Sequence, residues 1–395
     1  MQVASKFQKQ LLEATRQCFI DNPLSVATER AFWQTPRHLF VKRYRLGASN
    51  EWYDIDADNL AQHLPSIYRD GVLILLGDDD DDVPSTISQP SLVLFMLDML
   101  KLEPGQTVFE LGAGSGWNAA LIGNIVGPTG KVYSLEIIPE IAESAVHTIQ
   151  SLGIENVHII CGDGGAGYAP AAPYDRAIFT AGSYDIPHHF YEQIKETGLL
   201  LVVIKNEGGG DALFLLEKRE DHFESITALP CSFVKMTGQY CLDSLEPMAL
   251  TTLPEWRELK DQEISRIPFW WGGKGFGFVW RTLSIRSFLS ITEPLYCSFR
   301  VERTKQLYAE EQFFGLWDKD NRSLVIAKDD LIIAYGSPLA KDRLMQQIRH
   351  WVELGMPGSV SFNLRVYPID YHLSVGINQW IVKRRESQFL WSLNL

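Results

Sequence analysis

A short apolar run followed by closely spaced glycines places the strongest constraint on the fold of this chain. Thr107 to Leu111 has the composition of a buried parallel strand, and Gly112, Gly114 and Gly116 follow it directly. Glycine has no Cβ, so the backbone can turn tightly there and approach a ligand. The helical pattern from Trp117 to Val126 would direct unpaired N–H groups at whatever occupies the turn. Nicotinamide, flavin and S-adenosylmethionine folds all use such a strand–turn–helix unit.

The next two strands discriminate among these cofactors. Lys131 to Glu136 is predicted as the second strand, and Glu136 stands where an acid accepts hydrogen bonds from a ribose. The third strand, Val157 to Cys161, leads into a second acid, Asp163. A dinucleotide site has the pattern Gly-x-Gly-x-x-Gly, whereas the third glycine comes one position earlier here. We therefore favour S-adenosylmethionine, with the two acids at its ribose and adenine; the alternative is that both acids are solvated strand ends.

Length and composition limit the classes of protein. At 395 residues the chain exceeds a typical domain of roughly 100 to 200, so we expect two domains or one domain with a large appendage. A net charge of −13 without a Lys/Arg block argues against a nucleic-acid partner. The sequence has no signal-peptide pattern and no apolar run of about 18 residues, so we expect no membrane contact. Five scattered cysteines fit reduced thiols of a cytoplasmic protein. The sequence does not determine the oligomeric state.

The segment before the glycine-rich unit contains a candidate catalytic hydroxyl. Ser85 to Gln89 is rich in serine and threonine, and Pro90 follows, ahead of an amphipathic helix from Ser91 to Leu100. Ser88 could simply cap that helix. It also comes just before the strand that carries the glycines, close enough to cover a bound ligand.

The remaining segments predict an α/β catalytic part and an α+β C-terminal part, in three sequence regions: residues 1–84, 85–250 and 251–395. Predicted helices are Phe7–Asn22, Ser25–Gln34, Pro187–Lys195 and Pro338–Leu354. Predicted strands are Leu64–Leu76, Ala177–Thr180, Leu199–Ile204, an antiparallel closing pair of Ala212–Lys218 with Phe233–Met236, and then Glu311–Trp317, Ser323–Lys328, Leu331–Tyr335, Ser361–Tyr367 and Gln379–Lys383. Asp78 to Asp82 is predicted as a solvated loop. His188 and His189 have no further metal ligand at suitable spacing, so no metal site is predicted.

Six motifs together resemble one enzyme family. They are Thr86-Ile87-Ser88-Gln89-Pro90, Leu111 to Trp117, Gly162-Asp163-Gly164, Pro173 to Arg176, Thr180-Ala181 and Phe233-Val234. In order and spacing they are similar to the protein-L-isoaspartate O-methyltransferase family, over about Ala27 to Gly238. The resemblance implies a doubly wound, seven-stranded, Rossmann-like methyltransferase sheet. It also implies S-adenosylmethionine as donor, S-adenosylhomocysteine as product, and methylation of a peptide carboxylate that leads to a succinimide.

Site residues follow from the same resemblance. Ser88 would be the catalytic hydroxyl at the substrate carboxylate. The glycines would line the methionine part of the donor, Glu136 the ribose, and Asp163 with Gly164 the adenine. The full set of expected donor-binding residues is Thr86, Ile87, Glu110, Gly112, Gly114, Gly116, Glu136, Ile137, Asp163, Gly164 and Thr180.

Two departures leave the substrate open. The chain continues far beyond Gly238, and Tyr68 to Pro84 is an insertion. Both features resemble the subgroup of homologues that methylate aspartate in ribosomally made peptides and form aspartimide. The candidates are therefore repair of isoaspartyl sites in aged proteins, maturation of a dedicated peptide, and a non-catalytic adaptor that keeps the donor site. The C-terminal extension is expected to recognise the substrate.

Overall fold

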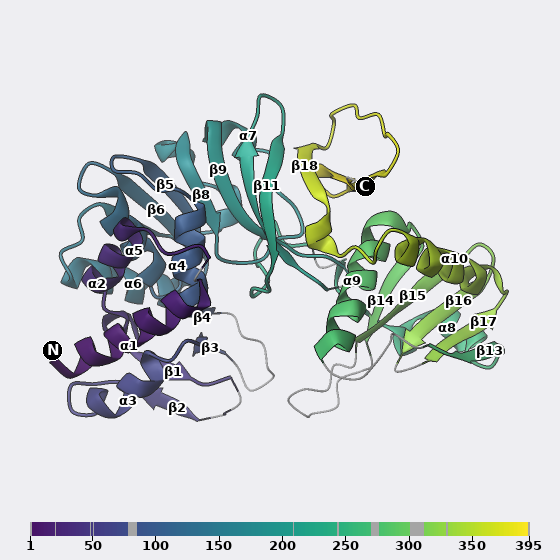
Figure 1. Ribbon diagram of the computed structural model, residues 1–395, viewed down its shortest axis with the longest axis horizontal. Coiled ribbons are helices and arrows are strands. Elements are labelled where there is room, and N and C mark those ends of the chain that lie inside the picture. Colours follow the sequence, from purple (N-terminus) through teal and green to yellow (C-terminus); the bar gives the residue numbers. More distant parts are fainter. Residues whose placement is uncertain are drawn as a thin grey trace.

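The computed structural model describes residues 2–19, 21–47, 49, 51–77, 85–207, 209–242, 245–269, 276–300, 312–328 and 331–393. The predicted loop Asp78 to Asp82 lies outside the described residues. In Figure 1 the N-terminal half and the large sheet lie to the left, a second sheet lies to the right, and the last strands lie between them. Among the described residues no helix is both long and apolar enough to cross a bilayer.

The N-terminal segment forms helices and a small sheet. The helices are α1 (Gln2–Cys18), α2 (Val26–Gln34), α3 (Leu60–Ile67) and the 3-10 helix η1 (Arg37–Phe40). The antiparallel sheet has the order β2-β1-β3-β4, with β1 at Arg43–Arg45, β2 at Trp52–Asp54, β3 at Leu73–Leu76 and β4 at Ser85–Ile87. The predicted strand-rich stretch Leu64 to Leu76 is therefore half wrong, because its first part belongs to α3.

The catalytic core is a doubly wound sheet, as predicted. Its strands are β5 (Thr107–Leu111), β6 (Lys131–Glu136), β7 (Val157–Cys161), β8 (Tyr174–Phe179), β9 (Ile194–Ile204), β10 (Ala212–Lys218) and β11 (Phe223–Pro230). Its helices are α4 (Pro90–Met99), α5 (Trp117–Val126), α6 (Pro139–Ser151) and the short α7 (Phe190–Gln193). The order is β11-β10-β9-β8-β5-β6-β7, with β5 to β9 parallel and β10 and β11 antiparallel.

Three C-terminal strands extend this sheet beyond the expected seven. They are β18 (Asn363–Pro368), β19 (Gln379–Lys383) and β20 (Ser387–Ser392), in the order β19-β20-β18, and β18 pairs with β11. The sheet therefore has ten strands, and three of them come from the predicted region 251–395. Sequence pattern predicts that a segment is a strand, but not which sheet edge it joins.

The rest of the C-terminal half forms a second sheet. Its order is β12-β14-β15-β16-β17-β13, with β12 at Met248–Ala249, β13 at Glu263–Pro268, β14 at Tyr296–Arg300, β15 at Gln312–Asp318, β16 at Ser323–Lys328 and β17 at Leu331–Gly336. The helices are α8 (Pro254–Leu259), α9 (Phe276–Thr292) and α10 (Leu339–Glu353). In Figure 1, α9 lies on the side of this sheet that faces the catalytic half.

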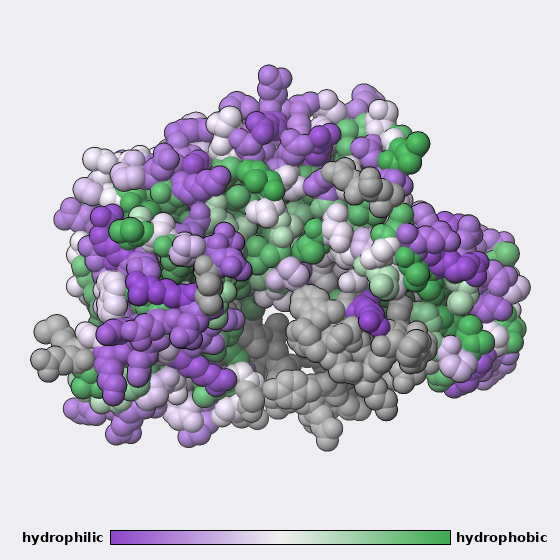
Figure 2. Space-filling model, viewed as in Figure 1, coloured by the Kyte–Doolittle hydropathy of each residue, from purple (hydrophilic) through white to green (hydrophobic). Residues whose placement is uncertain are grey.

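The large sheet separates two apolar cores, because side chains alternate between its two faces. On β9, Leu201 and Val203 belong to the core shared with the N-terminal helices, α4 and α5. Leu200, Val202 and Ile204 point to the other face, in a core that also contains Phe288 of α9 and Trp391 of β20, so this core runs across both halves of the chain. In Figure 2, hydrophobic residues gather in the middle of the face shown, whereas hydrophilic residues predominate on the left.

Two predicted elements of the core are wrong. Phe233 to Met236 is not the closing strand, because β11 takes that place and only Lys235 makes an isolated bridge. The helix predicted at Pro187 to Lys195 is reduced to α7, because β9 already begins at Ile194.

Candidate functional site

The glycine-rich turn has the conformation that its composition predicted. Gly112, Gly114 and Gly116 all have positive φ, at 91°, 52° and 82°. A Cβ at Gly112 would lie 2.5 Å from Oγ1 of Thr180, and one at Gly114 would lie 3.3 Å from the carbonyl oxygen of Thr86. Both positions therefore require glycine, because a side chain would close the space between β5, β8 and β4.

A pocket opens at the carboxyl ends of these strands. It brings together ten of the twelve predicted site residues, which come from five separate stretches of chain. They are Thr86, Ile87, Ser88, Gly112, Gly114, Glu136, Ile137, Asp163, Gly164 and Thr180. Ligands of open α/β sheets bind at this edge, where the strand order reverses. Here the reversal lies between β5 and β8.

Backbone amides orient both predicted acids. The Glu136 carboxylate accepts hydrogen bonds from the N–H of Gly114 at 2.8 Å and of Ile138 at 3.1 Å. Burial raises the pKa of Glu136, and these backbone bonds partly offset that effect. Asp163 accepts one bond per oxygen, from Gly165 N–H and Gln239 N–H, each at 2.8 Å. Each carboxylate keeps further lone pairs that can accept hydrogen bonds from a ligand.

Ser88 lies between β4 and α4 and is held by its backbone. The cap of α4 is Gln89, so Ser88 is not the helix cap. Asp70 instead accepts the bond from the backbone N–H of Ser91, at 2.9 Å, in the first turn of α4. Within the described residues no hydrogen bond engages the Ser88 hydroxyl, although the side chain lines the pocket. The hydroxyl is therefore available to a ligand.

Sequence reasoning missed the residue that fixes this segment. Arg37 of η1 is fully buried, and its two terminal nitrogens donate to five carbonyl oxygens. Two of these belong to Ile87 and Ser88, at 3.3 and 3.0 Å. Burial lowers the pKa of Arg37 to about 9, which leaves it charged at pH 7. An arginine after proline in a short polar segment gives no signal of this role in the sequence.

Two predicted donor residues do not line the pocket. Gly116 is the N-cap of α5, and a Cβ there would meet Ala145 and Ile149 of α6 at 3.5 and 3.6 Å, so it serves the turn and the helix packing. Glu110 is fully buried behind the turn, where its carboxylate accepts bonds from Asn118 and Ser134. Asn118 does line the pocket, so Glu110 acts on the site by positioning Asn118.

Glu110 is expected to make stability depend on pH. Burial raises its pKa to about 7 from an ordinary 4.5, so the folded protein holds a proton that the unfolded chain has lost. Stability should therefore fall as pH rises from about 4.5 to 7, by about 3 kcal/mol in total. Glu110→Gln keeps the shape and removes this titration, so its stability relative to wild type should rise between pH 5 and pH 8.

Denaturant unfolding of both proteins at the two pH values measures this difference. Glu103→Gln is the matched control, because Glu103 is exposed. Parallel pH profiles for Glu110→Gln and wild type would show that the carboxyl is not buried as a proton-binding group.

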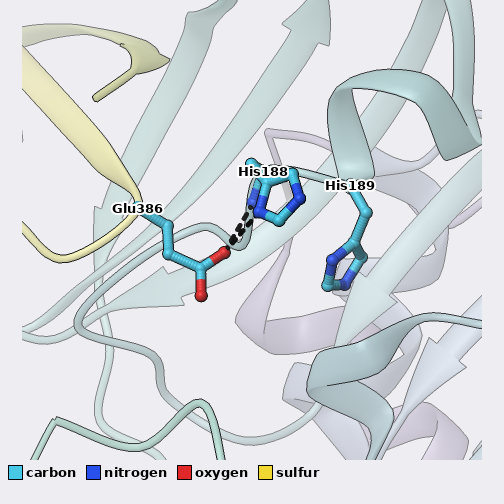
Figure 3. A group of neighbouring side chains, drawn as sticks. All are labelled: His188, His189 and Glu386. Carbon is cyan, nitrogen blue, oxygen red and sulfur yellow. Dashed lines mark hydrogen bonds and ion pairs between the residues drawn. The ribbon is translucent and has the colours of Figure 1, made fainter. Parts of the chain in front are cut away.

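Outside the pocket, the structure places a third polar side chain beside His188 and His189. The sequence offers no further metal ligand at suitable spacing, but Glu386 lies beside both histidines, and the three ligand atoms are within 4.8 Å of one another (Figure 3). Glu386 comes from the turn between β19 and β20, 198 residues further along the chain. Spacing within the sequence could not reveal a partner at that separation.

Known proteins resemble this chain in sequence and in fold. The family model described as protein-L-isoaspartate(D-aspartate) O-methyltransferase matches residues 11–240. A protein-L-isoaspartate O-methyltransferase of Pyrococcus horikoshii is 40% identical over 200 residues, which cover 50% of this chain and 78% of its own. Protein-L-isoaspartate O-methyltransferase 1 of Archaeoglobus fulgidus is 36% identical over 224 residues, which cover 56% and 91%.

One solved structure resembles nearly the whole chain. It is titled protein-L-isoaspartate O-methyltransferase and is similar at a TM-score of 0.55 and 24% identity, over 94% of this chain and 100% of its own. This similarity extends into the C-terminal half, beyond the residues that the family model matches.

Proposed function

Because the chain belongs to the protein-L-isoaspartate(D-aspartate) O-methyltransferase family, we propose that its pocket binds S-adenosylmethionine and that the enzyme methylates a carboxylate of a protein or peptide. One observation carries the proposal: the Ser88 segment stands over the same pocket as the glycine-rich turn and the two acids. A ligand held by the acids would therefore have its far end beside the Ser88 hydroxyl.

The residues present fit this donor. Glu136 would accept hydrogen bonds from the ribose hydroxyls, and Asp163 would accept one from the adenine amino group. Gly112 and Gly114 leave room for the methionine part, since a Cβ at either would enter that space. Thr180 lines the pocket, but its hydroxyl contacts the carbonyl oxygens of Leu111 and Gly112, so it shapes the turn.

The chain itself has little acid–base chemistry to perform. The donor supplies a sulfonium methyl group, whose carbon–sulfur bond breaks as a carbon–oxygen bond forms and whose electron pair stays on sulfur. A carboxylate is already an anion, so no general base is needed. Ser88 would donate one hydrogen bond to the carboxylate and hold its reacting oxygen in line. Apolar Val93 and Met96 of α4 line the pocket and would keep water away from that oxygen. The following backbone nitrogen can then attack the carbonyl carbon of the methyl ester. The bond from that carbon to the methoxy group breaks, methanol leaves with the proton of the nitrogen, and the succinimide closes.

We infer that the substrate approaches through a cleft between the two halves. Tyr184, Lys205 and Glu246 of the catalytic half line this cleft together with Leu283 of α9 and Ser359 of η6 (Ser359–Ser361). Lys235 lines both this cleft and the donor pocket, so the two are neighbours. A cleft built from both halves supports recognition of a peptide by the extension.

The choice between repair and peptide maturation rests on that cleft. A dedicated peptide would have to fill this cleft, whereas repair demands tolerance of many sequences. The extension by itself does not favour maturation, because a structure titled protein-L-isoaspartate O-methyltransferase aligns over 94% of this chain. We therefore propose isoaspartyl carboxylates as the first substrates to test and aspartate of a dedicated peptide as the second.

Two substitutions should separate catalysis from donor binding. Ser88→Ala removes a hydrogen bond to a charged group, worth about 1.5 to 3 kcal/mol, so kcat/KM should fall roughly tenfold to 150-fold. The donor's dissociation constant should stay near wild type, because Ser88 would contact the substrate carboxylate and not the donor. Glu136→Ala should instead weaken donor binding, by about 1.5 to 3 kcal/mol, because it removes a hydrogen bond to the ribose. Methyl transfer to a peptide with one isoaspartate gives the rates, and calorimetry gives donor affinity.

A second peptide substrate and the activity of the wild-type protein serve as controls for these two substitutions. The same peptide with aspartate in place of isoaspartate distinguishes the two substrates. Wild-type protein that binds the donor but methylates neither peptide would favour the adaptor. Full activity in Ser88→Ala would refute the role given to this hydroxyl, and unchanged donor affinity in Glu136→Ala would refute the placement of the ribose.

A further inference from the structure

A second polar cluster lies at the junction of the catalytic core and the C-terminal strands. His188 and His189 precede α7, and Glu386 lies in the turn between β19 and β20 (Figure 3). The Nδ1 atom of His188 lies 2.7 Å from Oε2 of Glu386, and the backbone N–H of His188 donates to the same oxygen at 3.1 Å. Within the described residues this is the one group of three such side chains whose ligand atoms converge.

Hydrogen bonds outside the cluster prepare its members as ligands. Nε2 of His189 lies 2.6 Å from the carbonyl oxygen of Gly165, which can only accept, so this nitrogen carries the proton and Nδ1 keeps its lone pair. A backbone carbonyl in this position is the usual support of a metal-binding histidine. Buried Asp185 holds the Glu386 segment, because it accepts from the backbone N–H of Glu386 at 2.8 Å and from the hydroxyl of Ser387.

An arginine beside the cluster leaves one carboxylate oxygen of Glu386 to the histidines. Arg385 Nε lies 3.6 Å from Oε1 of Glu386, whereas Oε2 is directed toward the histidines.

We propose that His188, His189 and Glu386 bind a divalent transition metal of the zinc class, with water in the fourth position. Two imidazoles and one carboxylate are a common zinc ligand set. Ligands at about 2.0 to 2.1 Å from a tetrahedral ion lie roughly 3.3 Å apart. The cluster must therefore contract from separations of up to 4.8 Å, and the exposed His188 side chain can rotate to allow this. Zinc displaces the proton between His188 and Glu386.

The site would fasten the C-terminal hairpin to the rim of the pocket. His189 contacts Gly165, which lines the pocket, and Arg385 donates to the carbonyl oxygen of Gln239 at 3.1 Å. The N–H of Gln239 in turn bonds Asp163. A metal that holds Glu386 against the two histidines therefore stabilises the turn on which both contacts depend.

The test uses the full chain with its affinity tag removed and its metals stripped by a chelator. Zinc titration by calorimetry should show one ion per chain, and cobalt(II) should give the visible absorption of a tetrahedral site. His188→Ala and Glu386→Gln should each weaken zinc binding by about 100-fold or more, since each removes a ligand. His147→Ala should bind zinc like wild type, because His147 is an exposed histidine on α6 outside the cluster.

Thermal melting completes the experiment. Zinc should raise the melting temperature of wild type and His147→Ala but not of the two cluster variants, because a ligand of the folded state alone stabilises that state. The variants should melt cooperatively near metal-free wild type, which shows that they are folded. Zinc affinity that is unchanged in both cluster variants, or wild-type binding only at millimolar zinc, would overturn the proposal.

Discussion

A chain that ends at Met248 is expected to unfold and not to leave a free methyltransferase core. Truncation removes β18, which pairs with β11, and exposes the face of β9 and β10 that the C-terminal half covers. Phe214 on β10 contacts Trp391 with ring centroids 5.8 Å apart, and Phe223 on β11 pairs with Val366. Both phenylalanines are fully buried. Exposing four or five such side chains costs about 1.5 to 3 kcal/mol each, which matches a typical total stability of about 5 to 15 kcal/mol.

Circular dichroism and thermal melting of the truncated chain measure this outcome. Point variants keep the test informative if the truncated chain cannot be obtained. Trp391→Ala in the full chain should lower the free energy of unfolding by about 3 to 5 kcal/mol, as for other large core side chains replaced by alanine. Ile377→Ala is the matched control in the same segment, because Ile377 is 92% exposed. A truncated protein with a cooperative melt near that of wild type would show that the two halves fold independently.

From the sequence alone, the C-terminal half would instead be interpreted as a domain that folds independently of the catalytic core. Residues beyond Gly238 resemble an added recognition domain, because the donor-binding motifs are complete before them. Strand pattern correctly indicates β15 to β19, but pairing of β18 with β11 joins residues more than 130 positions apart. The alternation that marks a strand is the same in either sheet. Which sheet a strand joins depends on which apolar surface it buries, and that surface exists only in the assembled fold.

The candidate site was more predictable than the domain organisation, for a physical reason. Gly112 and Gly114 are constrained by local backbone geometry, and Glu136 and Asp163 follow strands whose ends a parallel sheet brings together. These residues can therefore be predicted from the local sequence pattern. Glu110 shows the limit of such prediction: it lies on the same strand as Leu111, but its side chain is buried behind the turn, where its carboxylate accepts hydrogen bonds from Asn118 and Ser134.

The role of Arg37 cannot be predicted from the local sequence pattern, and replacing it should lower stability strongly. Arg37→Met keeps the apolar length of the side chain but removes every donor to five carbonyl oxygens. Buried polar groups left without a partner cost about 1 to 3 kcal/mol each, and water can reach some of these. We expect a loss of about 3 to 5 kcal/mol in the free energy of unfolding, the range for breaking a buried charged contact.

Arg37→Lys and Arg30→Met complete the series. A lysine keeps the charge but is a point donor that cannot span five carbonyls, so it should recover only part of the stability. Arg30→Met removes an exposed arginine from the neighbouring helix α2 and should change stability by less than about 0.5 kcal/mol. Denaturant unfolding at one pH ranks the three variants.

Kinetics then test whether Arg37 positions the Ser88 segment. At a temperature where Arg37→Lys remains folded, kcat/KM should fall more than donor affinity does, because the carbonyls of Ile87 and Ser88 lose their anchor while Glu136 and Asp163 keep their backbone partners. A positioning role of this kind lowers kcat/KM without changing the affinity for the donor. Equal losses in rate and donor affinity would mean that Arg37 holds the whole pocket and not this segment. Stability close to wild type in Arg37→Met would mean that the five contacts contribute nothing net to the fold.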